Sequence, residues 1–148
     1  MRKLKATYPN WDQVLEARAE DVEECIKEGG LSKIKTERIQ NILRTVKAER
    51  GKCCMDYLYD YDTESVKTDL ARFKGLGPKT ISCVLMFCLQ RAEFPVDTHV
   101  WKIAKALKWL PGSADRVDAY NHLNRRVPDD CKYDLHVLLV DYGVSMNL

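Results

Sequence analysis

The chain has 148 residues, enough for one compact domain, and we expect a single domain over residues 1–148. Apolar residues make up 45% and charged residues 31%, a balance that excludes an intrinsically disordered chain. There is no apolar run of membrane-spanning length and no recognisable leader, so we expect an intracellular protein with no membrane partner.

Helical periodicity runs through nearly the whole chain, and Val, Ile and Thr never collect into the alternating runs that are typical of strands. The sequence therefore predicts an all-α fold. In chain order, the predicted helices cover about residues 11–17, 19–28, 35–50, 63–73, 79–90, 98–108 and 114–126, followed by a last helix beyond Pro128.

Local signals predict how several of these helices begin and end. The predicted N-caps are Asn10, a residue of Asp62-Thr63-Glu64, Asp97 or Thr98, and Ser113. Gly51 is expected to end the helix over residues 35–50, whose buried stripe is predicted to be Ile39, Ile42, Leu43 and Val46. The helix over residues 79–90 is apolar nearly all round, so we expect it to be the buried, central helix.

The net charge of +2 is small but unevenly distributed along the chain. Between Val66 and Leu110, eight Lys and Arg stand against three acidic residues, a net charge of +5, and the remainder carries −3. A basic middle is the distribution expected of a localised phosphate-binding face, although such charges are also common on solvated helix surfaces. The six cysteines form no C-x-x-C pair, so neither a zinc nor another metal site is predicted.

The segment KGLGPKT, which begins at Lys74, joins two of the predicted helices. Glycine can adopt positive φ and lets the backbone approach a partner closely, and Leu76, between Gly75 and Gly77, can turn back into the core. The first amides of the second helix lack intrahelical partners and can bind a phosphate oxygen. The alternative is a tight helix connection without a ligand, but the neighbouring lysines, Lys74 and Lys79, favour phosphate binding.

A second motif, PVDTHV, begins at Pro95 and follows the hairpin at a distance typical of one family. Both motifs match those of that family, at Gly75, Gly77, Lys79 and Thr80 in the hairpin and at Asp97, Thr98 and His99 in the second motif. With these motifs, the chain resembles the endonuclease III-like members of the helix-hairpin-helix (HhH-GPD) DNA glycosylase superfamily over about five-sixths of its length. The resemblance implies a multi-helix DNA glycosylase fold with a helix-hairpin-helix over about residues 63–91.

The resemblance also implies base-excision repair by a DNA glycosylase with AP lyase activity. Lys79 would be the nucleophile and Asp97 would support departure of the base. A partly desolvated lysine at a helix N-terminus supplies free amine to attack the sugar C1′, and an ionised aspartate stabilises positive charge on the sugar. The residues then expected to contact double-stranded DNA at a damaged base or abasic site are Lys74, Gly75, Leu76, Gly77, Lys79, Thr80 and His99.

Two features depart from the family. The chain ends at Leu148 without the four-cysteine loop that binds an iron-sulfur cluster, so no cofactor is expected. Helices that normally precede the region of Tyr8 are lacking, so we expect self-association or a complementary segment elsewhere. The alternatives to an enzyme are a catalytically incomplete helix-hairpin-helix DNA-binding module and an α-helical protein-interaction domain. A eukaryotic source would imply a nuclear location.

Overall fold

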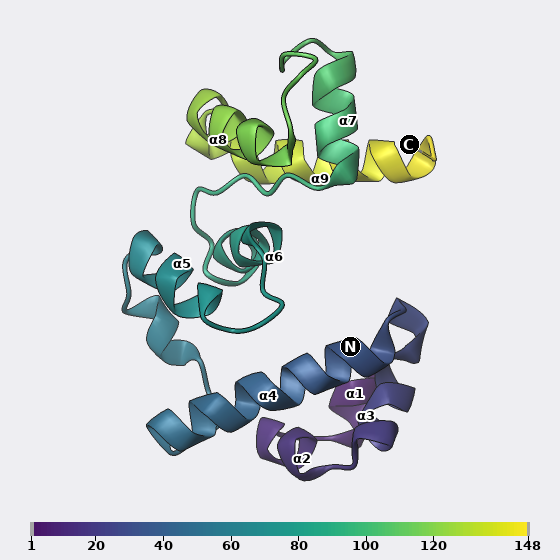
Figure 1. The fold of residues 1–148 in the computed structure, drawn as a ribbon, viewed down its shortest axis with the longest axis vertical. Coiled ribbons are helices and arrows are strands. Elements are labelled where there is room, and N and C mark those ends of the chain that lie inside the picture. The colour runs from purple at the N-terminus through teal and green to yellow at the C-terminus, as the bar shows by residue number, and fades with distance from the viewer. Residues whose placement is uncertain (1, 148) are drawn as a thin grey trace. The chain divides into compact units, whose positions relative to one another are not determined.

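The computed structural model describes residues 2–147, and every regular element in this range is helical. The predicted all-α fold is therefore confirmed (Figure 1). The chain divides into two compact units, one running up to Tyr61 and including Phe73–Gly75, the other containing Asp62–Arg72 and the chain from Leu76 onward. No helix in the described range is long and apolar enough to cross a bilayer.

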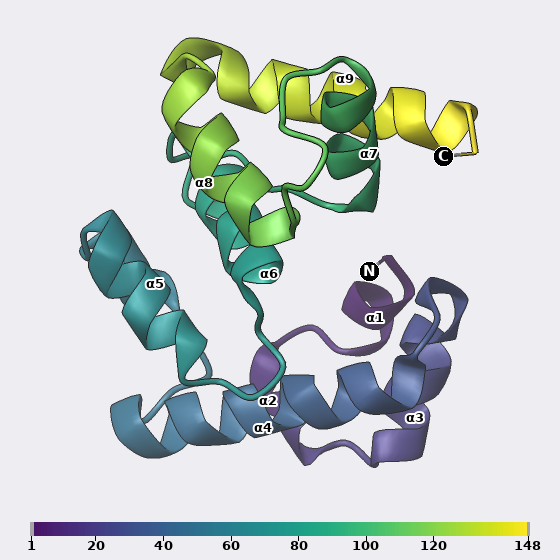
Figure 2. The same ribbon diagram turned by 45° about the horizontal axis from the view of Figure 1, so that its top comes forward.

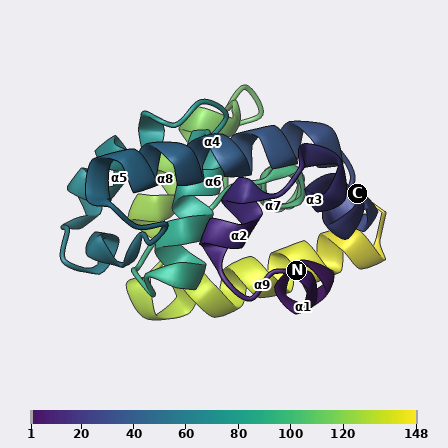
Figure 3. The same ribbon diagram turned by 90° about the horizontal axis from the view of Figure 1, so that it is seen from below.

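The first unit is built on one long helix. Its helices are α1 (Arg2–Thr7), α2 (Trp11–Glu16), α3 (Ala19–Ile26) and α4 (Ser32–Arg50). Figures 2 and 3 show α2 and α3 lying along α4. The core of this unit is formed by residues of all four helices and of the segment after α4: Leu4, Val14, Val22, Leu43 and Cys53. Helix α1 was not predicted, because four of its six residues are polar; burial of Leu4 in this core stabilises it.

In this unit, one helix start and one helix end lie at the residues that the sequence predicted. Asn10 accepts a hydrogen bond from the amide of Gln13 at 2.9 Å and begins α2, and Gly51, at φ +76°, ends α4. Helix α4 starts at Ser32, three residues before the predicted start, although Leu31 provides no side-chain cap. The side-chain amide of Gln40 on α4 donates to the carbonyl of Ala17 at 2.9 Å, and this hydrogen bond connects α4 to the end of α2.

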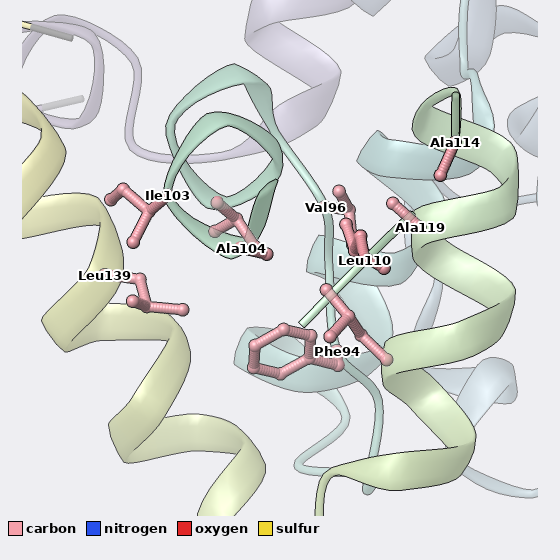
Figure 4. Packing of buried hydrophobic residues seen from close by; sticks show 10 residues of the cluster. Phe94, Val96, Ile103, Ala104, Leu110, Ala114, Ala119 and Leu139 are labelled. Carbon is pink, nitrogen blue, oxygen red and sulfur yellow. The ribbon is translucent and has the colours of Figure 1, made fainter. Parts of the chain in front are cut away.

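The second unit contains the remaining helices. They are α5 (Thr63–Ala71), α6 (Pro78–Cys83), a π-helical turn (Val84–Cys88), α7 (Thr98–Ala106), α8 (Arg116–Arg126) and α9 (Lys132–Ser145). Helices α7 and α9 pack against each other, and α8 lies beside α7. Figure 4 shows side chains of α7, α8, α9 and the segment around Phe94 pointing toward one another in one apolar core.

Two predictions for this unit were wrong. The helix predicted over residues 79–90 ends as a π-helical turn at Cys88, and it is not buried all round, because Phe87 is 46% exposed. The predicted cap at Ser113 is replaced by Asp115, whose carboxylate accepts from the amides of Val117 and Asp118, each at 2.8 Å. Helix α8 consequently begins at Arg116.

Candidate active site

Lys79 lies in the first turn of α6, directly after the glycine hairpin. The carbonyl of Gly77 accepts from the amides of Thr80 at 2.9 Å and Ile81 at 3.1 Å, which sets the start of the helix. Pro78 has no amide hydrogen, and the amides of Gly77 and Lys79 donate to no other group within residues 2–147. The Lys79 side chain is exposed, contrary to the expectation of partial desolvation, so its amine is open to a substrate.

The two glycines of the hairpin have different structural roles. Gly75 has φ +90°, a conformation that favours glycine, and its carbonyl accepts from Nη1 of Arg38 on α4 at 3.3 Å. A Cβ atom on Gly75 would overlap the guanidinium of Arg38. Gly77 has an ordinary φ of −82° and open space where a Cβ would lie. The backbone conformation therefore favours glycine at position 75 but not at position 77.

This difference predicts that alanine at the two positions has different effects on stability. Gly75→Ala should lower the free energy of unfolding by about 1–2 kcal/mol, because alanine is strained at positive φ and Arg38 loses its place. Gly77→Ala should change it by less than about 0.5 kcal/mol, as at other unstrained surface positions. Urea unfolding of the two variants measures both values, and equal losses would contradict the assignment.

Asp97 is the N-cap of α7, one of the two starts that the sequence offered. Its Oδ1 accepts from the amide of Val100 at 2.8 Å. The residue is half-buried, and within residues 2–147 its Oδ2 accepts no hydrogen bond. The carboxylate therefore has one oxygen engaged in the helix and a second available for a ligand.

The segment 92–96, which leads into Asp97, is anchored by two helices. The side-chain amide of Asn124 on α8 forms two hydrogen bonds with the backbone of Phe94, accepting from its N–H and donating to its carbonyl, each at 2.9 Å. Nδ1 of the buried His136 on α9 lies 3.0 Å from the carbonyl oxygen of Pro95. These contacts hold the backbone in front of Asp97 in one conformation.

The pKa of His136 depends on burial and on the two charged residues of the site. Burial lowers its pKa, the hydrogen bond to the carbonyl of Pro95 and the charge of Asp97 oppose this, and the charge of Lys79 lowers it further. The net shift is downward, so the ring is neutral at physiological pH, and its Nδ1 must carry the proton because a carbonyl only accepts. His136 is thus a positioning group.

A buried carboxylate, Glu93, ties three helices together. Its side chain accepts from the hydroxyl of Tyr120 on α8 and from that of Ser82 on α6 at 3.5 Å, and it lies 3.5 Å from Nζ of Lys67 on α5. These four residues are called the Glu93 cluster. Burial, together with the hydrogen bond and charge of Glu93, raises the pKa of Tyr120 to about 12, so the phenol stays protonated at neutral pH.

The charge of Lys67 is also retained in this cluster. Burial lowers the pKa of Lys67, but the hydrogen bond to Glu64 and the charge of Glu93 raise it more, so the net shift is upward. Glu93 is only 4% exposed, and a buried carboxylate is tolerated when it is paired with a cation and hydrogen-bonded. No feature of the sequence indicated that this acid would be buried.

A pocket of about 600 Å³ brings residues of both sequence motifs together, within the range of roughly 300–1,000 Å³ that is usual for ligand sites. All of its lining residues belong to the second unit: Pro78, Lys79, Val96, Asp97, Thr98, Arg116, Val117, Tyr120 and Asn121. Lys79 and Asp97 thus share one pocket, as the sequence led us to expect. The face of α8 that completes it was not predicted.

The other predicted site residues lie outside this pocket lining. Lys74, Gly77 and Thr80 are exposed and Leu76 is half-buried. His99 is half-buried against Gly143 of α9, where an added Cβ would lie only 2.5 Å from the Cβ of His99. His99 therefore packs at the contact of α7 with α9, and its contact with DNA stays a prediction.

Two aromatic residues of the second unit, Trp101 and Tyr142, differ in burial. Trp101 is packed against the core, and its Nε1 donates to the carbonyl of Ala114 at 3.0 Å. Tyr142 is 51% exposed. Its side chain lies on a face of α9 that also exposes Leu138.

Only some of the basic residues in the middle of the chain are free of internal partners. Lys67 is paired within the Glu93 cluster, and Lys105 lies over the ring of Trp101 at 4.5 Å. Four exposed lysines form no ion pair within the described range: Lys74, Lys79, Lys102 and Lys108. These are the charges available to a polyanion.

Comparison with known proteins finds relatives of this chain. The chain is 54% identical over 140 residues to an Arabidopsis thaliana protein named as a DNA glycosylase, covering 95% of this chain and 48% of that protein. It is 35% identical over 102 residues to the DNA glycosylase/AP lyase ROS1 of the same plant, covering 69% of this chain and 7% of ROS1. The chain thus spans about half the length of the first of these relatives.

Solved structures show the same fold. The structure of a non-covalent endonuclease III–DNA complex matches with a TM-score of 0.77 at 20% identity, over 96% of this chain and 62% of that one. A trapped endonuclease III–DNA covalent intermediate matches with a TM-score of 0.76, over 97% and 63% of the two chains. The family described as HhH-GPD superfamily base excision DNA repair protein matches residues 1–129. The chain therefore belongs to the HhH-GPD superfamily of base-excision DNA repair proteins.

Proposed function

We propose that this chain carries the catalytic centre of a DNA glycosylase with AP lyase activity, which removes a damaged or mismatched base from duplex DNA. The observation that carries the proposal is the pocket in which the exposed amine of Lys79 and the carboxylate of Asp97 both lie. An amine nucleophile beside a carboxylate is the pair that attack on a sugar carbon requires.

In the proposed reaction, the base is first rotated out of the stack, which costs least for a damaged or mispaired base. The free amine of Lys79 forms a bond to C1′, and the glycosidic bond breaks with its electron pair leaving on the base, which takes up a proton. Asp97 stabilises the positive charge that develops on the sugar. The nitrogen then loses its proton, the ring oxygen takes up a proton and the ring opens to a Schiff base. In the β-elimination that follows, C2′ loses a proton, a double bond forms between C2′ and C3′, and the bond between C3′ and the phosphate oxygen breaks with its electron pair leaving on the phosphate.

DNA would be held by the hairpin beside this pocket. The open amides of Gly77 and Lys79 suit the oxygens of a phosphate. Lys74, which is exposed, is proposed as a further phosphate contact in its own right. The chemistry uses only an amine and a carboxylate, so no metal or other cofactor belongs to the proposal. For a eukaryotic source, duplex DNA as the partner supports a nuclear location.

The test is borohydride trapping on a duplex that contains one abasic site. Borohydride reduces a Schiff base to a stable amine, so we expect a covalent adduct that is visible as a shifted band on a denaturing gel. The same duplex without the abasic site serves as the control and should give no adduct.

A second measurement separates the proposed enzyme from a non-enzymatic module. Duplex affinity without any adduct, weakening steeply as salt rises, would leave a catalytically incomplete helix-hairpin-helix DNA-binding module. Absence of both adduct and salt-sensitive binding would overturn both, and would favour a protein-interaction domain.

A further inference from the structure

Tyr120 belongs both to the lining of the pocket and to the Glu93 cluster. It is one of the residues that line the pocket with Lys79 and Asp97, and its hydroxyl donates to the carboxylate of Glu93. Glu93 in turn is 4% exposed and is held by Ser82 and Lys67. Tyr120 is thus a pocket-lining side chain whose hydroxyl is held by a buried network, and the proposed reaction does not use that network.

The fixed hydroxyl determines what Tyr120 can offer to a ligand. Because the phenol is protonated and its hydrogen is directed to Glu93, the polar end of Tyr120 is already engaged. The aromatic ring is the part of Tyr120 that remains available to a ligand in the pocket. Its orientation is set before any ligand arrives, because the hydrogen bond adds to the packing of α8.

The other walls suit a flat, partly polar ligand. Pro78, Val96 and Val117 contribute apolar surface, while Arg116 and Asn121 contribute hydrogen-bonding groups. A planar heteroaromatic base has an apolar face for stacking and polar edges for hydrogen bonds. The pocket combines both kinds of surface around one aromatic ring.

We propose that Tyr120 is the stacking wall that receives the extruded base, and that Glu93 is a positioning residue that holds the Tyr120 ring in place. This inference rests on the proposed function, because it assumes that a base enters the pocket. It adds a specificity-determining residue on α8, which contains neither of the two sequence motifs.

The test compares the affinity of each protein variant for two duplexes. One carries a single bulged 2-aminopurine nucleotide, a base that needs no unpairing. The other carries a tetrahydrofuran abasic analogue at the same position, which has no C1′ aldehyde and cannot form a Schiff base. The measured quantity is the ratio of the two Kd values. Loss of folded protein lowers both affinities equally and leaves the ratio unchanged, so the ratio reports only contacts with the base.

Substitution of Tyr120 gives the main result. Stacking of a base on an aromatic side chain is worth about 5- to 150-fold in affinity, so Tyr120→Leu should reduce the preference for the base-bearing duplex by a factor in this range. Tyr120→Phe keeps the ring and should keep most of the preference. Tyr133→Leu, which removes an exposed tyrosine that does not line the pocket, is the matched control and should behave as the parent protein.

Substitution of Glu93 tests the positioning role. Glu93→Gln can still accept from the Tyr120 hydroxyl and should retain the preference, whereas Glu93→Leu removes the acceptor and should lower it. An unchanged ratio in Tyr120→Leu would overturn the stacking role, and equal ratios in Glu93→Gln and Glu93→Leu would overturn the positioning role. Since 2-aminopurine binding needs no Schiff base, these results stand apart from the trapping experiment that tests the proposed function.

Discussion

Lys79→Ala is expected to abolish the borohydride-trapped adduct on an abasic duplex. Trapping requires a primary amine that can form a Schiff base, and Lys79 is the amine that lines the pocket with Asp97. The rate of adduct formation should fall by at least about 10³-fold, the scale on which removal of a covalent nucleophile acts. Single-turnover trapping at saturating protein measures this rate without a contribution from weaker binding.

Two matched variants distinguish the nucleophile from a phosphate contact. Lys79→Arg keeps the positive charge but has no nucleophilic amine, so it should bind the duplex with nearly the parent affinity and form no adduct. Lys102→Ala removes another exposed lysine of the basic middle, on α7 and outside the pocket, and should trap normally. Trapping by Lys79→Ala at the parent rate would show that another amine is the nucleophile.

Asp97→Asn is expected to lower the rate of base release by about 10²- to 10³-fold while leaving the fold intact. Loss of one preorganised electrostatic contact to a transition state costs on this scale. Asparagine caps a helix as well as aspartate does, so the amide of Val100 keeps its partner and the free energy of unfolding should hardly change. The rate is measured by single-turnover release from whichever altered base the parent protein removes, selected from duplexes with one deaminated, oxidised or alkylated base.

Asp97→Ala provides the comparison. It removes both the charge and the cap, so it should show the same catalytic loss and, in addition, about 1 kcal/mol less stability in urea unfolding. If Asp97→Asn releases the base at the parent rate while Asp97→Ala is merely less stable, Asp97 is only the N-cap of α7. The pair therefore separates the two functions of one carboxylate.

Several local features could be read directly from neighbouring residues. Asn10, Asp62 and Asp97 cap the helices that they precede, and Gly51 ends α4, because these preferences depend on a few adjacent backbone groups. The hairpin and the start of α7 were predicted for the same reason. The meeting of Lys79 and Asp97 in one pocket was predicted from the family resemblance of their two motifs.

Predictions were wrong where a distant residue decided between local alternatives. Ser113 and Asp115 both suit an N-cap, but Ala114 is buried and its carbonyl accepts from Nε1 of Trp101, so the chain turns into the core before α8 begins. Helix α1 is likewise too short and polar to be predicted by itself. It is stabilised by Leu4, through contacts with residues well beyond it in the chain.

The sequence by itself determined the all-α class, most helix ends and the two motifs that carry Lys79 and Asp97, since each depends on residues close together in the chain. The tertiary structure decided how the pocket is completed. Tyr120 and Lys67 lie 27 and 26 positions from Glu93 along the chain, so neither the burial of that acid nor the wall contributed by α8 has a local signal. A buried charge is tolerated only when it is paired and hydrogen-bonded, and here the partners are distant in sequence. Only the folded chain therefore shows which residues they are.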